Sequence, residues 1–308
     1  MCTYICRFVI PMRKISYTVP PTLDGSSVAA VLRSHGFSTA LLRSLKKTYG
    51  ALSRNGCPVR TVDPVHTGDI VAVELNTDGA TAPPSAEKAV IVYADRDILV
   101  VNKRAGMAMY ETYNHHGNAL SNAVAAAGFD GPFRPIYRLD KDTSGLVVLA
   151  RHRLSAAKLA GRVQKDYYAV VPGTYTGSGT VDAPIAHCPD STVKRCVDPA
   201  GVRAVTHWEA LGQQGGRTLL RVQLETGRTH QIRVHFAHLD TPLVGDSLYG
   251  TAPVGARHLL HCKTIRLMHP VREEPVAFDC PFPSDMEEWN QCLPTAPTTS
   301  LPASCCPP

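Results

Sequence analysis

The chain has 308 residues, of which 44% are hydrophobic and 19% charged, enough for one large core and a smaller second one. No stretch approaches the roughly 18 consecutive apolar residues that a membrane helix needs, and the first ten residues lack the pattern of a secretory signal. The composition argues against a membrane protein, and we expect a soluble, cytoplasmic one.

The number of cysteines and the net charge narrow the class of protein further. Ten cysteines are scattered along the chain without a Cys-x-x-Cys pair, so we expect reduced thiols rather than a zinc site or a disulfide framework. The formal net charge is +6, and residues 1–76 carry nine basic against four acidic residues, an excess of +5. A polyanionic partner would therefore be met first by the first quarter of the chain.

Two short helices are predicted near the start, over residues 23–35 and 39–49. Asp24 or Ser26 can cap the first helix, and Ser38 can cap the second. The second helix has an apolar face and a basic face. The apolar face carries Leu41, Leu42, Leu45 and Tyr49, and the basic face carries Arg43, Lys46 and Lys47.

A hairpin follows the helices. The turn Arg54-Asn55-Gly56, a short strand near 58–62, a turn at 66–69 and a strand over 70–75 complete a compact unit. This order of elements resembles the S-four-type RNA-binding domain, named for a ribosomal protein, in which the second helix and the hairpin hold RNA backbone. The resemblance implies RNA contacts by Arg43, Lys46, Lys47 and Arg54; the alternative is a solvated basic face.

The rest of the chain predicts a larger α+β domain with a mixed, mainly antiparallel sheet flanked by helices. We assign 15–76 to the small α+β RNA-binding domain, 77–86 to a linker, 87–293 to the large domain and 294–308 to a disordered tail. The predicted strands of the large domain are 90–93, 98–102, 146–150, 168–171 and 219–224, and the predicted helices are 119–127 and 154–163.

Two segments of the large domain carry candidate chemistry. Asp140 lies in a polar turn just before the strand 146–150, where a rigid support can aim its carboxylate. Arg228 follows a glycine at the end of the strand 219–224, from which an arginine can reach a carboxylate on a neighbouring loop.

These segments resemble the signature motifs of RluA-family pseudouridine synthases. The family's Arg-Leu-Asp-x-x-Thr-Ser-Gly pattern stands at 138–145, and its Thr-Gly-Arg-x-His-Gln-Ile-Arg-Val-His pattern at 226–235. Further similarity lies in the segments at 102–107, 165–171, 245–250 and 258–261. The resemblance spans about 87–293 in the family's order, and the leading domain fits members that carry an S-four-type module.

The resemblance implies a role for each matching residue. Asp140 matches the essential aspartate, and Tyr167 matches the tyrosine that packs on the flipped base and can assist proton removal. Arg228 matches the basic residue that pairs with the aspartate, and Arg138 the arginine that helps to extrude the nucleotide. Tyr137 departs from the His that commonly precedes Arg-Leu-Asp, and Arg104 from the usual Pro; we expect both to affect substrate choice.

The reaction explains why no cofactor is expected. The uracil is detached from the ribose at nitrogen, turned and rejoined through carbon-5, so nothing is oxidised or hydrolysed. The carboxylate must be ionised although burial would raise its pKa, and an adjacent arginine offsets that cost. The target base must be flipped out of its stack, and stacking on an aromatic ring compensates for part of that cost.

Three alternatives remain. The run Asp140-Lys141-Asp142-Thr143 mimics the nucleophile motif of haloacid-dehalogenase-type phosphatases, but the chain has no Asp-Asp pair for the magnesium ion. The histidines at 230, 235 and 238 could suggest zinc, without the His-Glu-x-x-His spacing. The third alternative is an inactive RNA-binding or ribosome-assembly module. We expect a monomer that acts on large-subunit ribosomal RNA, or else on transfer RNA, and that uses no metal.

Overall fold

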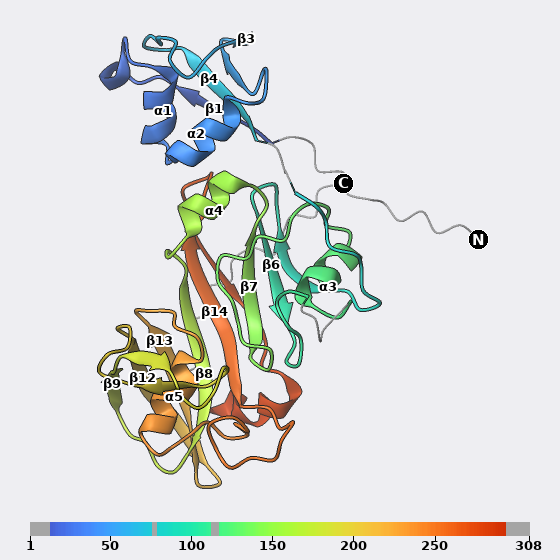
Figure 1. Ribbon diagram of the computed structural model, residues 1–308, viewed down its shortest axis with the longest axis vertical. Helices are drawn as coiled ribbons and strands as arrows, with labels where there is room; N and C mark the ends of the chain where they lie inside the picture. The colour runs from blue at the N-terminus through green and yellow to red at the C-terminus, as the bar shows by residue number, and fades with distance from the viewer. Residues whose placement is uncertain (1–12, 76–78, 112–116, 294–308) are drawn as a thin grey trace, which may run out of the picture. The chain divides into compact units, whose positions relative to one another are not determined.

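The computed structural model describes residues 13–75, 79–111 and 117–293 (Figure 1). The predicted tail, 294–308, and part of the predicted linker lie outside the described residues. The chain divides into two compact units, one made of Met1–Tyr167 with His261–Pro281 and the other of Tyr168–Leu260 with Phe282–Pro308.

The first unit begins with a four-stranded antiparallel sheet. The strands are β1 (Arg13–Thr18), β2 (Leu52–Arg54), β3 (Cys57–Pro58) and β4 (Ile70–Leu75), in the order β1-β4-β2-β3. Strand β1, which was not predicted, pairs with β4 along its whole length, from Arg13 opposite Leu75 to Thr18 opposite Ile70. Helices α1 (Val28–Ser34) and α2 (Thr39–Leu45) pack their leucines and valines into the core beneath this sheet.

The structure confirms most of the predicted local signals here and corrects three. Ser38 caps α2, Asn55 and Gly56 take the left-handed conformations of a two-residue hairpin turn, and the strand 70–75 is as predicted. The first helix begins only at Val28. Its cap is therefore Ser27, whose side chain accepts from the Ala30 amide, rather than Asp24 or Ser26.

Tyr49 was wrongly assigned to the apolar face of the second helix. Helix α2 ends at Leu45, so the helical period no longer applies four residues later, and Tyr49 is 94% exposed. The strand near 58–62 is also shorter than predicted: β3 ends at Pro58, which has no amide hydrogen to extend the ladder.

A larger mixed sheet has the strand order β5-β6-β7-β14-β8-β13-β12-β9, with β15 also paired to β14. Strands β7 and β14 pair in parallel, whereas the pairs β5–β6, β6–β7, β12–β13, β12–β9 and β14–β15 are antiparallel. This agrees with the predicted mixed, mainly antiparallel sheet. The strands are β5 (Val90–Ala94), β6 (Ile98–Lys103), β7 (Ser144–Ala150), β8 (Gln164–Pro172), β9 (Ser178–Asp182), β12 (Val205–Gln214), β13 (Arg217–Leu224), β14 (Leu260–Met268) and β15 (Pro275–Asp279).

The remaining elements flank this sheet in their respective units. The first unit adds α3 (Leu120–Ala126) and α4 (Arg153–Leu159), and the second adds α5 (Gln231–His238) and a 3-10 helix over Ser284–Cys292. The second unit also holds a small hairpin, β10 (Ile185–His187) with β11 (Arg195–Val197). No helix in the described part of the chain is long and apolar enough to cross a membrane.

One glycine fixes how closely β7 and β14 approach each other. Gly145 lies opposite Cys262 in the parallel register and has a φ of +116°. A Cβ atom built on Gly145 would lie 2.2 Å from the Cys262 carbonyl oxygen and 2.6 Å from its nitrogen. Because these atoms belong to the backbone of a central strand, no side-chain movement can relieve the overlap.

We therefore predict that Gly145→Ala lowers the free energy of unfolding by about 3 kcal/mol, through overlap and backbone strain together. Urea unfolding followed by circular dichroism measures the change. Gly227→Ala is the control, because nothing lies within 4 Å of a Cβ at that position. Equal unfolding midpoints for the two variants would show that the strands can separate at no cost.

Candidate active site

Asp140 lies in the turn that leads into β7. Its carbonyl oxygen accepts a hydrogen bond from the Thr143 amide at 3.2 Å, which closes the turn. Upstream, the Ile136 amide donates to the Val148 carbonyl at 2.9 Å, so the chain segment that precedes Asp140 lies against β7. Leu139 is buried and Asp140 half-buried. The turn thus presents a carboxylate from the end of a fully buried strand.

A buried lysine supports the same turn. Lys103, at the end of β6, is 0% exposed, and its Nζ donates to the carbonyls of Arg104 at 3.0 Å, Met107 at 2.8 Å and Lys141 at 2.9 Å. An ammonium group away from water needs such partners, because an unpaired buried charge costs several kcal/mol. Lys103 therefore ties the loop after β6 to the residue that follows Asp140.

The Thr-Ser pair of the same motif is structural. Thr143 and Ser144 are each 2% exposed. The Ser144 hydroxyl lies 2.9 Å from Nδ1 of His261, and Nε2 of the same ring lies 3.3 Å from Sγ of Cys280. This buried chain of polar groups joins the start of β7 to β14 and to the segment after β15.

Tyr167, on β8, is 6% exposed and close to Asp140. Burial raises the pKa of the Tyr167 hydroxyl well above its ordinary value, and the neighbouring Cys262 and Asp140 raise it further. Tyr167 therefore keeps its proton at neutral pH. The structure thus brings together, within one unit, two of the three residues predicted for catalysis.

Arg228, the third, belongs to the second unit and is exposed. Its amide donates to Oε1 of Gln231 at 3.0 Å, and its Nε donates to the Arg203 carbonyl at 3.1 Å. The buried Gln231 also accepts a hydrogen bond from the Thr226 hydroxyl at 2.8 Å and donates one to the Val205 carbonyl at 3.0 Å. The loop that carries Arg228 is therefore well ordered by Gln231, and the pairing of Arg228 with Asp140 stays a prediction.

The second unit contains a buried ion pair. Nε and Nη2 of Arg233 donate to the two carboxylate oxygens of Asp246 at 2.7 and 2.9 Å. Burial alone would raise the pKa of Asp246, but the Arg233 guanidinium lowers it overall. Asp246 also accepts from the Leu248 and Tyr249 amides. The two residues lie in separate motif segments, and the sequence does not pair them because the contact joins residues 13 positions apart across a loop.

Two of the three histidines of the zinc alternative, His230 and His235, are used in hydrogen bonds. His235 places Nδ1 2.8 Å from the Thr206 hydroxyl and Nε2 2.9 Å from the Ala183 carbonyl, and Nδ1 of His230 lies 2.8 Å from the Tyr249 hydroxyl. Both ring nitrogens of His235 are therefore engaged inside the protein, which argues against a zinc ligand there.

A different group has metal-like spacing. Over residues 13–75, 79–111 and 117–293, the side chains close enough to share a cation are Asp95, Asp97 and His269. The Asp95 carboxylate already lies 2.8 Å from Nε2 of His269 and accepts a hydrogen bond from Arg272 at 3.1 Å, and the Asp97 carboxylate lies 2.9 Å from Nε2 of His152. We interpret this group as an ion-pair network, since its acceptors already face basic side chains.

The residues predicted to contact RNA lie in two places. Arg43, Lys46 and Lys47 are exposed around the end of α2. Arg54, on β2, is half-buried, and its Nη1 donates to the Pro64 carbonyl, so its guanidinium also serves the domain itself.

Arg138 is exposed two residues before Asp140. Burial raises the pKa of the nearby Tyr110, and the positive charge of Arg138 opposes that rise. Tyr110 is 43% exposed and meets Phe133 edge to face, with ring centroids 5.2 Å apart. Arg138 thus stands beside an exposed aromatic ring, a combination that suits unstacked bases.

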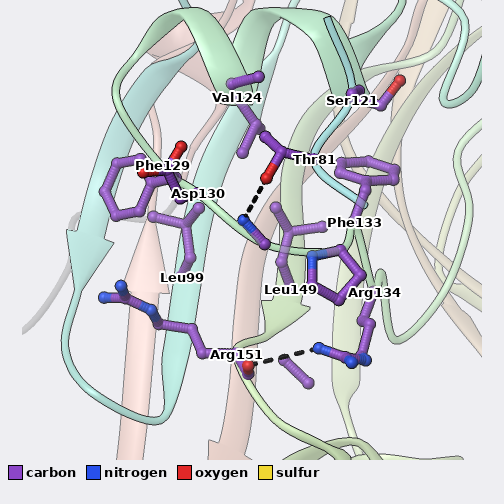
Figure 2. Close-up of a pocket in the computed structure, with 15 residues that line it drawn as sticks. Thr81, Leu99, Ser121, Val124, Phe129, Asp130, Phe133, Arg134, Leu149 and Arg151 are labelled. Carbon is purple, nitrogen blue, oxygen red and sulfur yellow. Dashed lines mark hydrogen bonds between the residues drawn. The ribbon is translucent and has the colours of Figure 1, made fainter. Parts of the chain in front are cut away.

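Phe133 also lines a small pocket (Figure 2). Its free volume of about 40 Å³ accepts a few water molecules and is too small for a nucleobase. The Gly131 amide donates to the Thr81 hydroxyl at 2.7 Å across it. This pocket is therefore not the substrate site. Its lining includes Thr81, Leu99, Ser121, Val124, Phe129, Asp130, Phe133, Arg134, Leu149 and Arg151.

The candidate site thus consists of a half-buried carboxylate beside a buried tyrosine, on an α+β fold with a mixed sheet. A family described as RNA pseudouridylate synthase matches residues 97–238. An uncharacterized RNA pseudouridine synthase of Bacillus subtilis is 36% identical over 266 residues, covering 82% of this chain and 94% of that protein.

Two further proteins agree. Ribosomal large subunit pseudouridine synthase D of Xanthomonas campestris is 36% identical and covers 89% of this chain and 91% of its own. The structure of human RNA pseudouridylate synthase domain containing 1 superposes with a TM-score of 0.52 at 27% identity, covering 68% of this chain and 89% of the other. The chain belongs to the RNA pseudouridylate synthase family, and it converts uridine to pseudouridine in RNA.

We predict that Lys103→Met lowers the free energy of unfolding by about 3 kcal/mol and slows the reaction, because the variant takes the shared donor from three carbonyls, one of them buried, and releases the turn of Asp140. Chemical denaturation and a single-turnover assay measure the two effects. The exposed Lys88, changed to Met, should alter stability by less than about 0.5 kcal/mol. A Lys103 variant as stable and as fast as the Lys88 variant would contradict the supporting role.

Proposed function

We propose that this enzyme modifies large-subunit ribosomal RNA, with Asp140 as its essential carboxylate. The observation that carries the proposal is the placement of Asp140, half-buried in a turn braced by Lys103 and next to the buried Tyr167. The RNA class follows the relative from Xanthomonas campestris, whose name specifies the large ribosomal subunit.

The environment of Tyr167 favours one of its two expected roles. A tyrosine whose pKa is raised by burial does not supply a phenolate base at neutral pH, whereas its ring can still stack on a flipped uracil. Asp140 then performs the chemistry as the ionised group, and Arg228 supplies the opposite charge that keeps it ionised in the complex. Arg138 acts beside it on the extruded strand.

We further propose that residues 15–76 form an S-four-like RNA-binding domain, followed by a linker over 77–86 and a catalytic domain over 87–293. The support is the basic surface around α2. A hollow of about 400 Å³ there is lined by Arg33, Arg43 and Lys46 together with the Ser27 and Thr39 side chains. Guanidinium, ammonium and hydroxyl groups around one hollow suit the phosphates of a backbone.

The first test replaces Asp140. We expect cells that lack this gene to lose specific pseudouridines from large-subunit ribosomal RNA, and a wild-type copy to restore them. An Asp140→Asn copy should not restore them, because the amide keeps the shape and removes the charge. Chemical labelling of pseudouridine maps the sites, and a single-turnover assay with purified protein confirms the loss. Lost sites confined to transfer RNA would contradict the RNA class, and restoration by Asp140→Asn would contradict the role of Asp140.

The second test reverses the charge of Arg43, Lys46 and Lys47 by changing each to Glu. RNA affinity should fall, and the slope of log affinity against log salt should flatten by about 0.7 per lost contact on a single strand or about 0.9 on a duplex. The rate at saturating RNA should change little.

The matched control reverses three exposed basic residues outside this domain: Lys88, Arg162 and Arg217. An equal loss of affinity in the control would indicate an effect of net charge alone. Parent values of affinity and slope in the test variant would show that the basic end of α2 is only a solvated face.

A further inference from the structure

The most exposed aromatic ring in the described part of the chain has no role in the function proposed above. Tyr49 is 94% exposed and lies just after the end of α2, where the chain turns toward β2. Two hydrogen bonds close this turn: the Thr48 amide donates to the Leu45 carbonyl at 3.2 Å, and the Ala51 amide donates to the Thr48 carbonyl at 3.3 Å. The backbone therefore holds Tyr49 at a defined place with its ring in solvent.

Tyr49 lines a hollow of about 560 Å³ whose walls are mainly apolar. Leu45 and Leu52 line it from the core of the domain, and Val62 lines it as a side chain that is 65% exposed. A single exposed apolar side chain is ordinary on a protein surface. An exposed tyrosine and an exposed valine around one hollow of ligand-binding size are typical of a binding surface.

The second exposed side chain, Val62, is also held in place by the backbone on both sides. The carbonyl of the buried Thr61 accepts a hydrogen bond from the Ala29 amide at 2.9 Å, and the Asp63 carbonyl accepts one from the Val28 amide at 3.0 Å. Val62 thus projects between two residues that are tied to the start of α1. A hollow with preformed walls loses little conformational entropy when it binds a partner.

This apolar hollow adjoins the basic hollow of about 400 Å³ that is lined by Arg33 and Arg43. The two hollows share three lining residues, which are Lys46, Thr61 and Val62. The ammonium group of Lys46 therefore lies at their common edge. A ligand that extends across this edge meets positive charge on one side and apolar surface on the other.

The other two charged residues of the apolar hollow, Arg60 and Asp63, neutralise each other. Nε of Arg60 donates to Oδ1 of Asp63 at 3.1 Å, and the Arg60 amide donates to Oδ2 at 2.8 Å. Apart from the shared Lys46, the apolar hollow thus carries no net charge. It suits an uncharged planar ring, whereas the basic hollow suits an anion.

We propose that the two hollows together bind one unpaired nucleotide of the substrate RNA, with its base stacked on Tyr49 and its phosphate beside Lys46. A single ribose separates the base of a nucleotide from its phosphate, so an uncharged hollow that adjoins a basic one matches both groups. Bases inside a duplex are stacked on their neighbours and present only their edges, so the site takes a loop, a bulge or a single-stranded flank. This inference rests on the proposed RNA-binding domain and names the form of RNA that it recognises.

The test measures how tightly the full chain binds a short RNA strand of adenosine and cytidine, and the same strand paired with its complement. The single strand offers no uridine to the catalytic site. Tyr49→Ala should weaken binding of the single strand about tenfold, the loss expected for one stacked base, and leave binding of the duplex within about twofold. Tyr49→Phe keeps the ring and should bind like the parent. The salt dependence should not change in either variant, because no phosphate contact is lost.

Ile70→Ala is the matched control, because Ile70 is 49% exposed in the same domain and lines neither hollow. It should bind the single strand like the parent. Parent affinity in Tyr49→Ala, or an equal loss in Ile70→Ala or on the duplex, would overturn the proposal. So would self-association of the chain in analytical ultracentrifugation that Tyr49→Ala abolishes without a change in RNA affinity, since the hollow would then receive a second copy.

This inference and the proposed domain function fail in different ways. If reversing the charges of Arg43, Lys46 and Lys47 weakens RNA binding whereas Tyr49→Ala does not, the domain holds RNA backbone and has no base site. If the charge reversal leaves the affinity and its salt slope at parent values, the proposed role of the domain in holding backbone is wrong instead.

Discussion

The contact on which the site depends is the approach of β7 to β14 at Gly145. Backbone meets backbone there, with no room for a Cβ atom. The register that follows places Ser144 opposite His261 and Gly145 opposite Cys262. One steric constraint therefore sets two things at once: the strand from which the Asp140 turn projects, and the buried pairing of Ser144 with His261. A glycine near the proposed catalytic aspartate acts here through strand packing rather than through flexibility.

Two buried basic side chains, Lys103 and Arg233, hold the loops around them through hydrogen bonds. Lys103 gathers three carbonyls around its ammonium group, and Arg233 holds Asp246 through two hydrogen bonds. Such groups add little net stability compared with apolar residues of the same size, but removing one partner is costly because the other is left unpaired in a dry interior. Both therefore suit loops that must adopt one conformation. The family's motifs specify scaffold residues as well as the chemical group.

The sequence predicts whatever depends on local chemistry. Apolar residues give the strand 70–75 its bounds, the Asn55-Gly56 pair gives the hairpin, and the motif places Asp140 before β7. Contacts between distant segments escape this reasoning. Strand β1 is recognised only by its pairing with β4, some 55 residues away, and the contact of Gly145 with Cys262 joins β7 to β14.

The two acidic groups of the proposed site, the Asp140 carboxyl and the Tyr167 phenol, differ in how deeply they are buried. Burial favours the neutral form of a carboxyl group and of a phenol alike, so an enzyme that needs one charged and the other neutral must bury them differently. Tyr167 is 6% exposed, with its pKa raised, whereas Asp140 is half-buried in a polar turn. The charge of Asp140 in turn makes ionisation of Tyr167 harder, so the carboxylate helps to keep the tyrosine neutral. A flipped base entering this site would meet the carboxylate at the edge and the neutral ring deeper in, and its stacking would exclude water from Asp140 only after the base is bound. The carboxylate would thus lose its solvation at the moment when uridine is in position to react.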